Sequence, residues 1–480
     1  MTPPRIARRM AALFAALAIF AATALDPTAV QAEVKPAALF SDNAVLQQGM
    51  KVPVWGTAND GEKVTVKLQG QEKSATAKDG KWRVDLDALK AGGPFELTIA
   101  GEKDTVTLKN ILVGEVWIAS GQSNMQWPVN QSADPKENIA GAANPQIRLF
   151  TVPRQATPEP QSDVKGAWSE CDPKTVPDFS AVAYFFGRDL QKQLKVPVGL
   201  ISTNYGGTPA EAWTSQKTMQ ATAALKDLAK NPPTKSPNSP SGLYNAMIHP
   251  LLPYAIRGAI WYQGESNAGR AYEYRTLFPA MIGDWRAAWG QGDFPFLLVQ
   301  LAPFTAIVRD PVESDWAELR EAQLLATQVL PNVAMAVITD LGEEKDIHPK
   351  KKAPVGARLA LAARAVAYGE PVEFAGPAYY QQKIDGDHIV LEFKHLGGGL
   401  VAKDGPLTGF TIAGADRKFV HAQAEIKGDT IVVSSPDVKS PVAVRFGWWN
   451  YPVVNLWNNA GLPASPFRTD DFPLTTAPKK

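Results

Sequence analysis

The fold of this chain is decided by the stretch Glu115-Val116-Trp117-Ile118-Ala119-Ser120-Gly121-Gln122-Ser123-Asn124-Met125. The apolar run from Val113 to Ala119 predicts a buried strand of a parallel sheet. Gly121 follows the strand, and glycine suits a sharp turn where φ becomes positive. Ser123 then falls just beyond the carboxyl end of the strand, where open α/β sheets bind their ligands. The stretch therefore predicts a candidate nucleophile, with a helix-capping serine as the alternative.

Outward from this strand, residues 111–370 alternate strand patterns with helical patterns, which predicts a mainly parallel α/β sheet. The strand candidates are short apolar runs: Val113–Ala119, Ile147–Val152, Val198–Thr203, Ala255–Trp261, Phe296–Leu301 and Val333–Thr339. The helix candidates are Ala181–Leu194, Thr218–Ala229, Tyr272–Trp289, Trp316–Val329 and Val355–Ala367. We expect this α/β domain to carry the chemistry.

On both sides of this domain, apolar and polar residues alternate with period two. Residues 33–110 hold several such runs separated by turn residues, which predicts a small antiparallel, immunoglobulin-like sandwich. Residues 371–480 return to the same alternation and predict a second β module packed on the α/β domain. Within that module, the segment Trp448-Trp449-Asn450-Tyr451 either contacts a sugar or closes a domain interface.

The composition excludes several classes of protein. Of 480 residues, 45% are hydrophobic, which suffices for at least one large core. The net formal charge of +1 gives no reason to expect nucleic acid or a membrane surface as a partner. Cys171 is the single cysteine, so the chain is not a disulfide scaffold.

The N-terminus resembles a secretory signal peptide. Arg5, Arg8 and Arg9 precede an apolar stretch from Met10 to about Leu25, and Val30-Gln31-Ala32 forms a small-residue cleavage site. We therefore expect residues 1–32 to be removed. The mature chain is then exported, to a periplasm or the exterior.

Four segments at predicted strand ends contain one candidate set for acyl transfer. That chemistry needs a nucleophile, a base, a group that orients the base, and N–H donors for the oxyanion. The segments are Gly121-Gln122-Ser123-Asn124, Asn204-Tyr205-Gly206-Gly207-Thr208, Trp261-Tyr262-Gln263-Gly264-Glu265-Ser266-Asn267 and Asp346-Ile347-His348-Pro349. The hypothesis requires these remote loops to converge.

The candidate base is His348, because Ser123 is a weak nucleophile unless an imidazole takes its proton. Of the five histidines, only His348 lies in a loop beyond a predicted parallel strand. Asp346 stands two residues earlier and is the candidate that holds the Nδ1–H of the ring. Glu343 and Glu344 are the competing candidates for that role.

Three kinds of N–H group are candidates for the oxyanion hole. The first is the backbone N–H of Ser123, and the second is a backbone N–H at Gly206 or Gly207. The third is a side-chain amide from Gln263 or Asn267. Loss of one such donor typically costs about 100- to 1000-fold in rate.

These four segments resemble the sialate O-acetylesterase-like family within the SGNH hydrolase superfamily. The C-terminal segment from Asn455 to Thr469 also resembles the closing segment of that family. The resemblance implies a flavodoxin-like three-layer domain, a Ser-His-Asp site and no metal or organic cofactor. It also implies that Ser123 is the nucleophile, that His348 is the base, and that Gly206 or Gly207 is an oxyanion donor.

The chain departs from the wider superfamily at the acid. The acid usually stands three residues before the histidine, at the position that Lys345 occupies here. A Ser–His dyad is therefore an alternative to a triad that contains Asp346.

The leading hypothesis is an exported carbohydrate O-acetylesterase that uses a serine acyl-enzyme. Its substrate is an acetylated carbohydrate, either O-acetyl sialic acid or a plant polysaccharide such as xylan, xyloglucan or pectin. The second hypothesis is a non-catalytic glycan-binding protein, which predicts sugar affinity without acetate release. A lipase or thioesterase is the third, but no long aliphatic run near the motifs supplies an acyl groove.

Overall fold

The computed structural model describes residues 34–478, so the predicted signal peptide lies outside the described residues. The molecule is a mixed α/β structure with several sheets, and all six strands predicted for residues 111–370 form. They are β8 (Thr105–Gly121), β9 (Asn144–Thr151), β11 (Val198–Asn204), β12 (Gly258–Tyr262), β13 (Phe296–Val299) and β14 (Val333–Ala336). These strands are parallel, in the order β9-β11-β8-β12-β13-β14, and β10 (Ser169–Cys171) adds an antiparallel edge beside β9.

Helices cover both faces of this sheet, so its strands are buried on both sides. Val116 and Ile118 of β8 belong to the core that also holds α5 (Ala271–Trp289) and α6 (Asp315–Val329). The alternate residues Trp117 and Ala119 belong to the core that holds α3 (Ala181–Leu194) and α7 (Lys352–Val366). The residues from Val116 to Ala119 are all apolar for this reason.

The helix predicted over Thr218–Ala229 is wrong in part. The chain forms only α4 (Gln216–Ala221), followed by the 3₁₀ turns η3 (Ala223–Leu225) and η4 (Leu228–Lys230). Thr222 leaves the helix in an extended conformation, and its hydroxyl donates to the carbonyl of Thr218 at 2.9 Å. A threonine that bonds locally in this way favours a helix end over a helix interior.

The N-terminal β region shares a strand with the central sheet. Its strands are β1 (Lys35–Pro36), β2 (Val45–Gln47), β3 (Val52–Thr57), β4 (Lys63–Leu68), β5 (Gln71–Thr76), β6 (Lys81–Leu86) and β7 (Gly92–Ala100). The first half of β8 pairs with β2 and β7, and its second half pairs with β11 and β12. The core is continuous across this junction, where Phe40 and Trp55 pack against Tyr254. β5 was not predicted because its sequence is polar.

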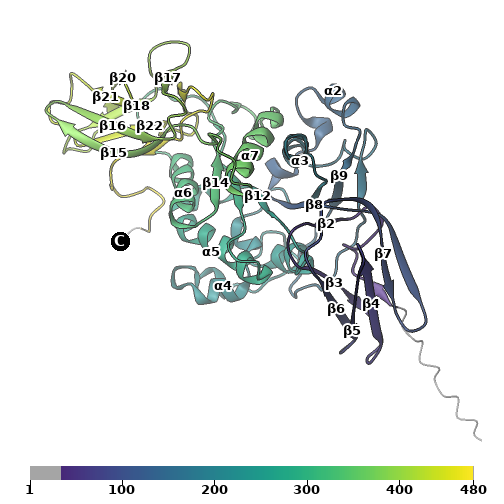
Figure 1. The fold of residues 1–480 in the computed structure, drawn as a ribbon. Helices are drawn as coiled ribbons and strands as arrows, with labels where there is room; N and C mark the ends of the chain where they lie inside the picture. The colour runs from purple at the N-terminus through teal and green to yellow at the C-terminus, as the bar shows by residue number, and fades with distance from the viewer. Residues whose placement is uncertain (1–33, 479–480) are drawn as a thin grey trace, which may run out of the picture.

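The C-terminal region contains two four-stranded sheets around a common core. The first consists of β15 (Ala378–Asp385), β16 (His388–Lys394), β20 (Gln423–Lys427) and β21 (Thr430–Ser434), and the second of β18 (Phe410–Ala413), β19 (Val420–His421), β22 (Ala443–Phe446) and β24 (Phe467–Arg468). β17 (Leu400–Ala402) pairs with β23 (Leu456–Asn458). Figure 1 shows the two β regions on opposite sides of the α/β part.

Arg320 of α6 joins the C-terminal region to the central sheet. Its side chain is fully buried and donates to the carbonyls of Trp449 and Asn450 at 2.7 and 2.8 Å. It also donates to the carbonyls of Leu301 and Ala302, just past β13, at 2.8 and 3.0 Å. The segment that begins at Trp448 therefore closes a domain interface, which was one of its two predicted roles.

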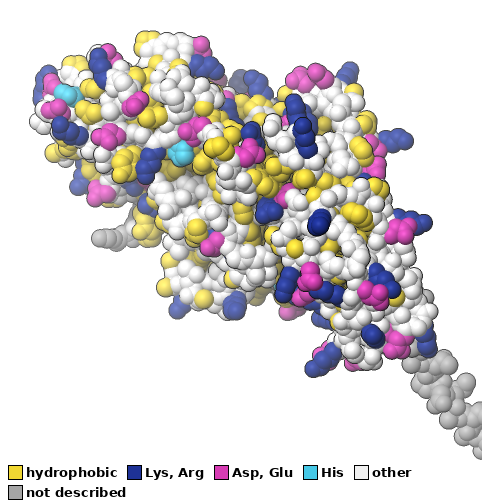
Figure 2. Space-filling model, viewed as in Figure 1, with side chains coloured by type: hydrophobic (Ala, Val, Ile, Leu, Met, Phe, Trp, Pro, Cys, Tyr) yellow, Lys and Arg dark blue, Asp and Glu magenta, His cyan; other side chains and the backbone are white. Residues whose placement is uncertain are grey.

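The surface carries charges of both signs. On the face drawn in Figure 2, basic and acidic side chains are interspersed, in keeping with the near-zero net charge. Within residues 34–478, every helix is too short or too polar to cross a bilayer.

Candidate active site

Three of the four predicted segments meet at one edge of the sheet. β8 lies between β11 and β12, and Gly121 at its end stands opposite both Asn204 and Tyr262. The residues that follow these three parallel strands therefore emerge side by side. This position, where the chain order reverses about β8, is where open α/β sheets place their ligands.

The turn before Ser123 has the geometry that the sequence predicts. Gly121 has a φ of +135°, and a Cβ atom at this position would lie 2.1 Å from the carbonyl oxygen of Tyr262, so only glycine fits. The buried side chain of Gln122 accepts the N–H groups of Gly264 and Ser266 at 3.4 and 3.3 Å. The turn is thereby fixed to the segment after β12.

Ser123 and His348 are in direct contact. The Oγ of Ser123 lies 2.9 Å from the Nε2 of His348, although 225 positions separate them in the chain. Ser123 begins the short helix α1 (Ser123–Gln126), and His348 lies in the loop between β14 and α7. The imidazole stacks on the ring of Trp127, with centroids 4.8 Å apart and planes 17° apart. The stacking fixes the ring with Nε2 toward the serine.

Asp346 lies beside the Nδ1 edge of the His348 ring. Its Oδ1 is 3.5 Å from Nδ1 of the ring and accepts the backbone N–H of His348 at 2.9 Å. The contact with the ring is longer than a normal hydrogen bond. The competing candidates act elsewhere, because Glu343 accepts the N–H of Lys350 and Glu344 accepts that of Ile307.

The pKa of His348 is lowered from the ordinary histidine value. Partial burial is the largest cause, the positive charge of Lys352 acts in the same direction, and Asp346 opposes both. A lowered pKa keeps the imidazole neutral at neutral pH, as a general base must be.

Gly206 lies against the candidate nucleophile. Its N–H donates to Oε1 of Gln126 at 2.8 Å, and a Cβ atom at this position would lie 3.3 Å from the Cβ of Ser123. Gly207 follows with a φ of +72°. The N–H of Ser123 is the first of a helix and has no acceptor within that helix.

The structure does not bring the amides of Gln263 and Asn267 to Ser123. Both side chains are buried in a network of their own, in which Gln263 Nε2 donates to Asn267 Oδ1 at 2.7 Å and to the carbonyl of Thr208 at 3.2 Å. Asn267 donates to Glu211 at 3.0 Å, and its Oδ1 also accepts the N–H of Ala210. These amides brace the loops behind the site.

An open cleft of about 410 Å³ leads to Ser123 and His348. Its remaining lining residues are Gln126, Trp127, Pro128, Gln131, Arg154, Asp178 and Gly206. Arg154 is exposed and forms no ion pair with any residue in the range 34–478. Arg270, in contrast, does not line the cleft and pairs with Glu211 and Glu273. Over the same described range, no cluster of three or more His, Cys, Asp or Glu side chains is arranged to hold a metal ion.

Sequence reasoning missed several residues of this cleft. Gln126 and Trp127 directly follow the predicted turn, so their proximity to Ser123 was an available signal. Arg154 and Asp178 come from loops in which no motif marks them.

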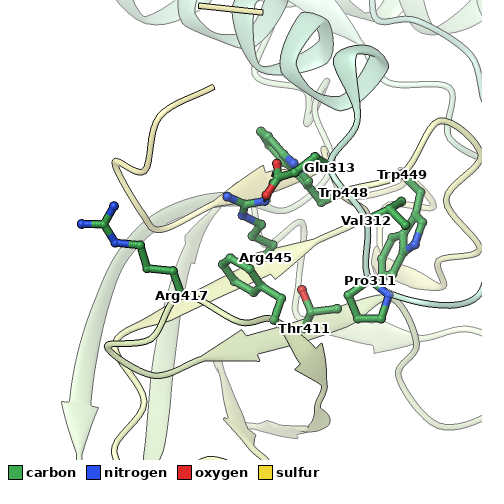
Figure 3. A pocket seen from close by; sticks show the side chains of 9 residues that line it. Pro311, Val312, Glu313, Thr411, Arg417, Arg445, Trp448 and Trp449 are labelled. Atoms are coloured by element: carbon green, nitrogen blue, oxygen red, sulfur yellow. Dashed lines mark hydrogen bonds and ion pairs between the residues drawn. The ribbon is translucent and has the colours of Figure 1, made fainter. Parts of the chain in front are cut away.

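A second pocket, the interface pocket, lies between the C-terminal region and the segment Pro311–Glu313 (Figure 3). It has a volume of about 140 Å³. Arg445 is buried there and donates to Glu313 at 2.9 and 3.0 Å and to Asp470 at 2.9 and 3.2 Å. Its guanidinium also lies 4.2 Å from the ring centroid of Phe419 and 5.0 Å from that of Trp448.

Comparisons with known proteins show the family to which the chain is related. Residues 113–365 match the model of a family described as carbohydrate esterase, sialic acid-specific acetylesterase. Human sialate O-acetylesterase is 36% identical over 363 residues, which cover 68% of this chain and 69% of the human protein. The rat sialate O-acetylesterase is 34% identical over 388 residues, with 68% and 72% covered.

A solved structure extends the likeness to nearly the whole chain. The crystal structure of a carbohydrate acetylesterase from Xanthomonas citri superimposes with a TM-score of 0.86 and 41% sequence identity, covering 92% of this chain and all of that chain. The chain belongs to the sialic acid-specific acetylesterase family of carbohydrate esterases, and it is an ester hydrolase.

Proposed function

We propose that this protein is an exported carbohydrate O-acetylesterase that removes acetyl groups from sugar hydroxyls through a serine acyl-enzyme. The observation that carries the proposal is the 2.9 Å contact between Ser123 Oγ and His348 Nε2 at the end of an open cleft. Family membership supports the acetylesterase reaction, and the contact supports the serine mechanism.

In the first half of the reaction, Ser123 Oγ attacks the acetyl carbonyl carbon while His348 Nε2 takes the hydroxyl proton. The imidazolium that forms is stabilised by the carboxylate of Asp346, 3.5 Å from Nδ1. His348 then donates the proton to the departing sugar oxygen. In the second half, a water molecule loses a proton to His348 and attacks the carbonyl carbon of the acetyl-serine; the bond from that carbon to Ser123 Oγ then breaks, His348 returns the proton to Oγ, and acetate is released.

The negative charge that develops on the carbonyl oxygen is stabilised by the N–H groups of Ser123 and Gly206, with Gly207 as the alternative donor. Gly206 N–H donates to Gln126 Oε1 in the free protein. We therefore expect the substrate oxygen to displace the Gln126 side chain. Gln263 and Asn267 have no part in this proposal, because neither lines the cleft.

The proposal includes the architecture that the family resemblance implies. Residues 111–370 form a flavodoxin-like three-layer SGNH domain, which is supported by the parallel strand order and the helices on both faces. Residues 33–110 form an immunoglobulin-like module and residues 371–480 a C-terminal β-sandwich-like module. Export follows from the signal-like segment at residues 1–32.

Arg154 offers a way to distinguish two substrate classes. The relatives named sialate O-acetylesterases suggest a substrate with a carboxylate, and an unpaired guanidinium in the cleft is suited to bind one. The neighbour from Xanthomonas citri is called a carbohydrate acetylesterase, without a named sugar. If sialate is the substrate, Arg154→Ala should lower kcat/KM for O-acetyl sialic acid about tenfold and leave acetylated xylan and xyloglucan unchanged. Equal effects on all three would contradict a carboxylate-binding role.

The direct test of the serine mechanism is Ser123→Ala. We expect kcat for p-nitrophenyl acetate to fall by about 10⁴-fold, with an unchanged melting temperature, because the Ser123 side chain is small and only partly buried. Wild-type turnover by the purified variant would refute the assignment. The alternative of a non-catalytic glycan-binding protein predicts no acetate release from any of these esters, and membership of an esterase family does not favour it.

A further inference from the structure

A buried group of charged and polar side chains lies directly behind the Ser123–His348 pair. It consists of Asn124, Glu265 and Lys352, which come from α1, the segment after β12, and the first turn of α7. Asn124 and Lys352 are each 1% exposed, and Oε2 of Glu265 is buried without a hydrogen-bond partner among the described residues. Buried charges are rare unless they are paired, so this arrangement needs a reason.

Asn124 is the hub of the group. Its Oδ1 accepts a hydrogen bond from Nζ of Lys352, and its Nδ2 donates to Glu265 Oε1 at 2.6 Å. The reverse orientation of the amide would place its NH₂ group against an ammonium and its oxygen against a carboxylate. The two charges therefore fix the orientation of the amide.

The same amide links the Ser123 turn to the His348 loop. Asn124 follows Ser123 directly, and its Nδ2 also donates to the carbonyl of Ile347 at 3.0 Å, one residue before His348. The ring centroids of Tyr262 and Trp127 lie 5.3 and 6.0 Å from the Lys352 ammonium, and Trp127 also stacks on the imidazole. The position of the Ser123 turn relative to the His348 loop thus depends on these contacts.

The charges also act on the imidazole. The groups that face His348 are Lys352, which lowers its pKa, and Asp346, which raises it. Burial lowers the pKa of Lys352 to about 7, opposed by Glu265, Asp346 and Glu343, and burial raises that of Glu265. The other charged side chains at the cleft are Arg154 and Asp178.

We propose that Lys352 is a positioning residue for the esterase reaction: through Asn124, and with Glu265 as its counter-charge, it holds the Ser123 turn against the His348 loop. This inference rests on the proposed serine mechanism. Lys352 touches neither substrate nor reacting atoms in this role.

The test compares Lys352→Met with Lys351→Met. Methionine keeps an unbranched side chain, one atom shorter, and removes the charge, and Lys351 is the exposed neighbour that serves as a matched control. For Lys352→Met we expect kcat to fall about 10- to 100-fold with KM nearly unchanged, because a small misplacement of reacting groups is costly. The acidic limb of kcat/KM should move to higher pH, since a cation that lowers the pKa of His348 is lost. Lys351→Met should change neither quantity.

If Lys352→Met fails to fold, the double variant Lys352→Met/Glu265→Gln is tested in its place, because it removes both charges and leaves neither buried alone. It should fold, should retain the lowered kcat and should show the same displaced limb. A wild-type acidic limb in either folded variant would overturn the inference. If that result came with an inactive Ser123→Ala, the serine mechanism would stand and only the positioning role would fail.

Discussion

The cleft at Ser123 and the interface pocket contain similar residues in different arrangements. Each is lined by at least one arginine and at least one tryptophan. In the interface pocket, Arg445 is held by two carboxylates and packs against aromatic rings, so its hydrogen-bonding capacity is used within the fold. In the cleft, Ser123 and His348 contact each other at an open end, and Arg154 has no ionic partner among the described residues. Arg417 of the interface pocket also has no ion pair among the described residues, so the contact between a hydroxyl and an imidazole, rather than an unpaired arginine, distinguishes the cleft.

The largest effect is expected at Gly206, because added atoms there should impair activity without affecting the fold. Gly206→Ala should lower kcat/KM for p-nitrophenyl acetate about tenfold and Gly206→Val about 100-fold, because each step crowds Ser123 and Gln126 further. The graded pair is its own control. Equal activity of both variants and the wild type would show that this backbone does not border the reacting group.

A smaller effect is expected at Asp346. In serine triads the loss of the carboxylate costs about 10⁴-fold, but here the 3.5 Å contact is long, so Asp346→Asn should lower kcat only about 10- to 100-fold. Asparagine can still accept the N–H of His348, which preserves the loop.

The pH profile of this variant gives a second readout. Asp346 raises the pKa of His348, so its removal should lower that pKa and move the acidic limb of kcat/KM to lower pH. This direction is opposite to that expected for Lys352→Met. A limb that moves upward in Asp346→Asn would contradict the electrostatic account of the site.

The interface pocket should respond in stability and not in catalysis. Arg445→Met should destabilise the protein by about 2–3 kcal/mol, because buried charge-assisted hydrogen bonds are lost while Asp470 keeps its pair with Arg468 at 3.1 Å. Chemical denaturation measures the loss, and kcat should stay within about twofold of the wild type. A large fall in kcat in the folded variant would remove the distinction between the two pockets.

The elements that were predicted have strong local patterns. Ala181–Leu194 forms the helix that its spacing predicts, and the apolar run within β8 forms the buried central strand. The Ser123 turn was also accessible, because Gly121 and the end of the strand fix its place.

Features that depend on residues far away in the chain could not be predicted from local sequence patterns. Gln263 and Asn267 belong to one of the four predicted segments. Each side chain is nevertheless hydrogen-bonded to a buried partner and points away from the cleft. Arg154 and the contact of Asn124 with Lys352 join segments that no local pattern connects. The contact between Ser123 and His348 was thus predictable from their motifs, whereas the side chains that surround them depend on packing.

In the proposed mechanism, Ser123 carries the acetyl group between the two half-reactions. Wild-type protein should be mixed with p-nitrophenyl acetate, quenched rapidly in acid, digested and examined by peptide mass spectrometry. The account predicts acetyl-Ser123 that forms early and disappears as substrate is exhausted. Turnover with unmodified Ser123 at every time point, under conditions in which a serine-directed phosphonate also fails to label it, would contradict the account.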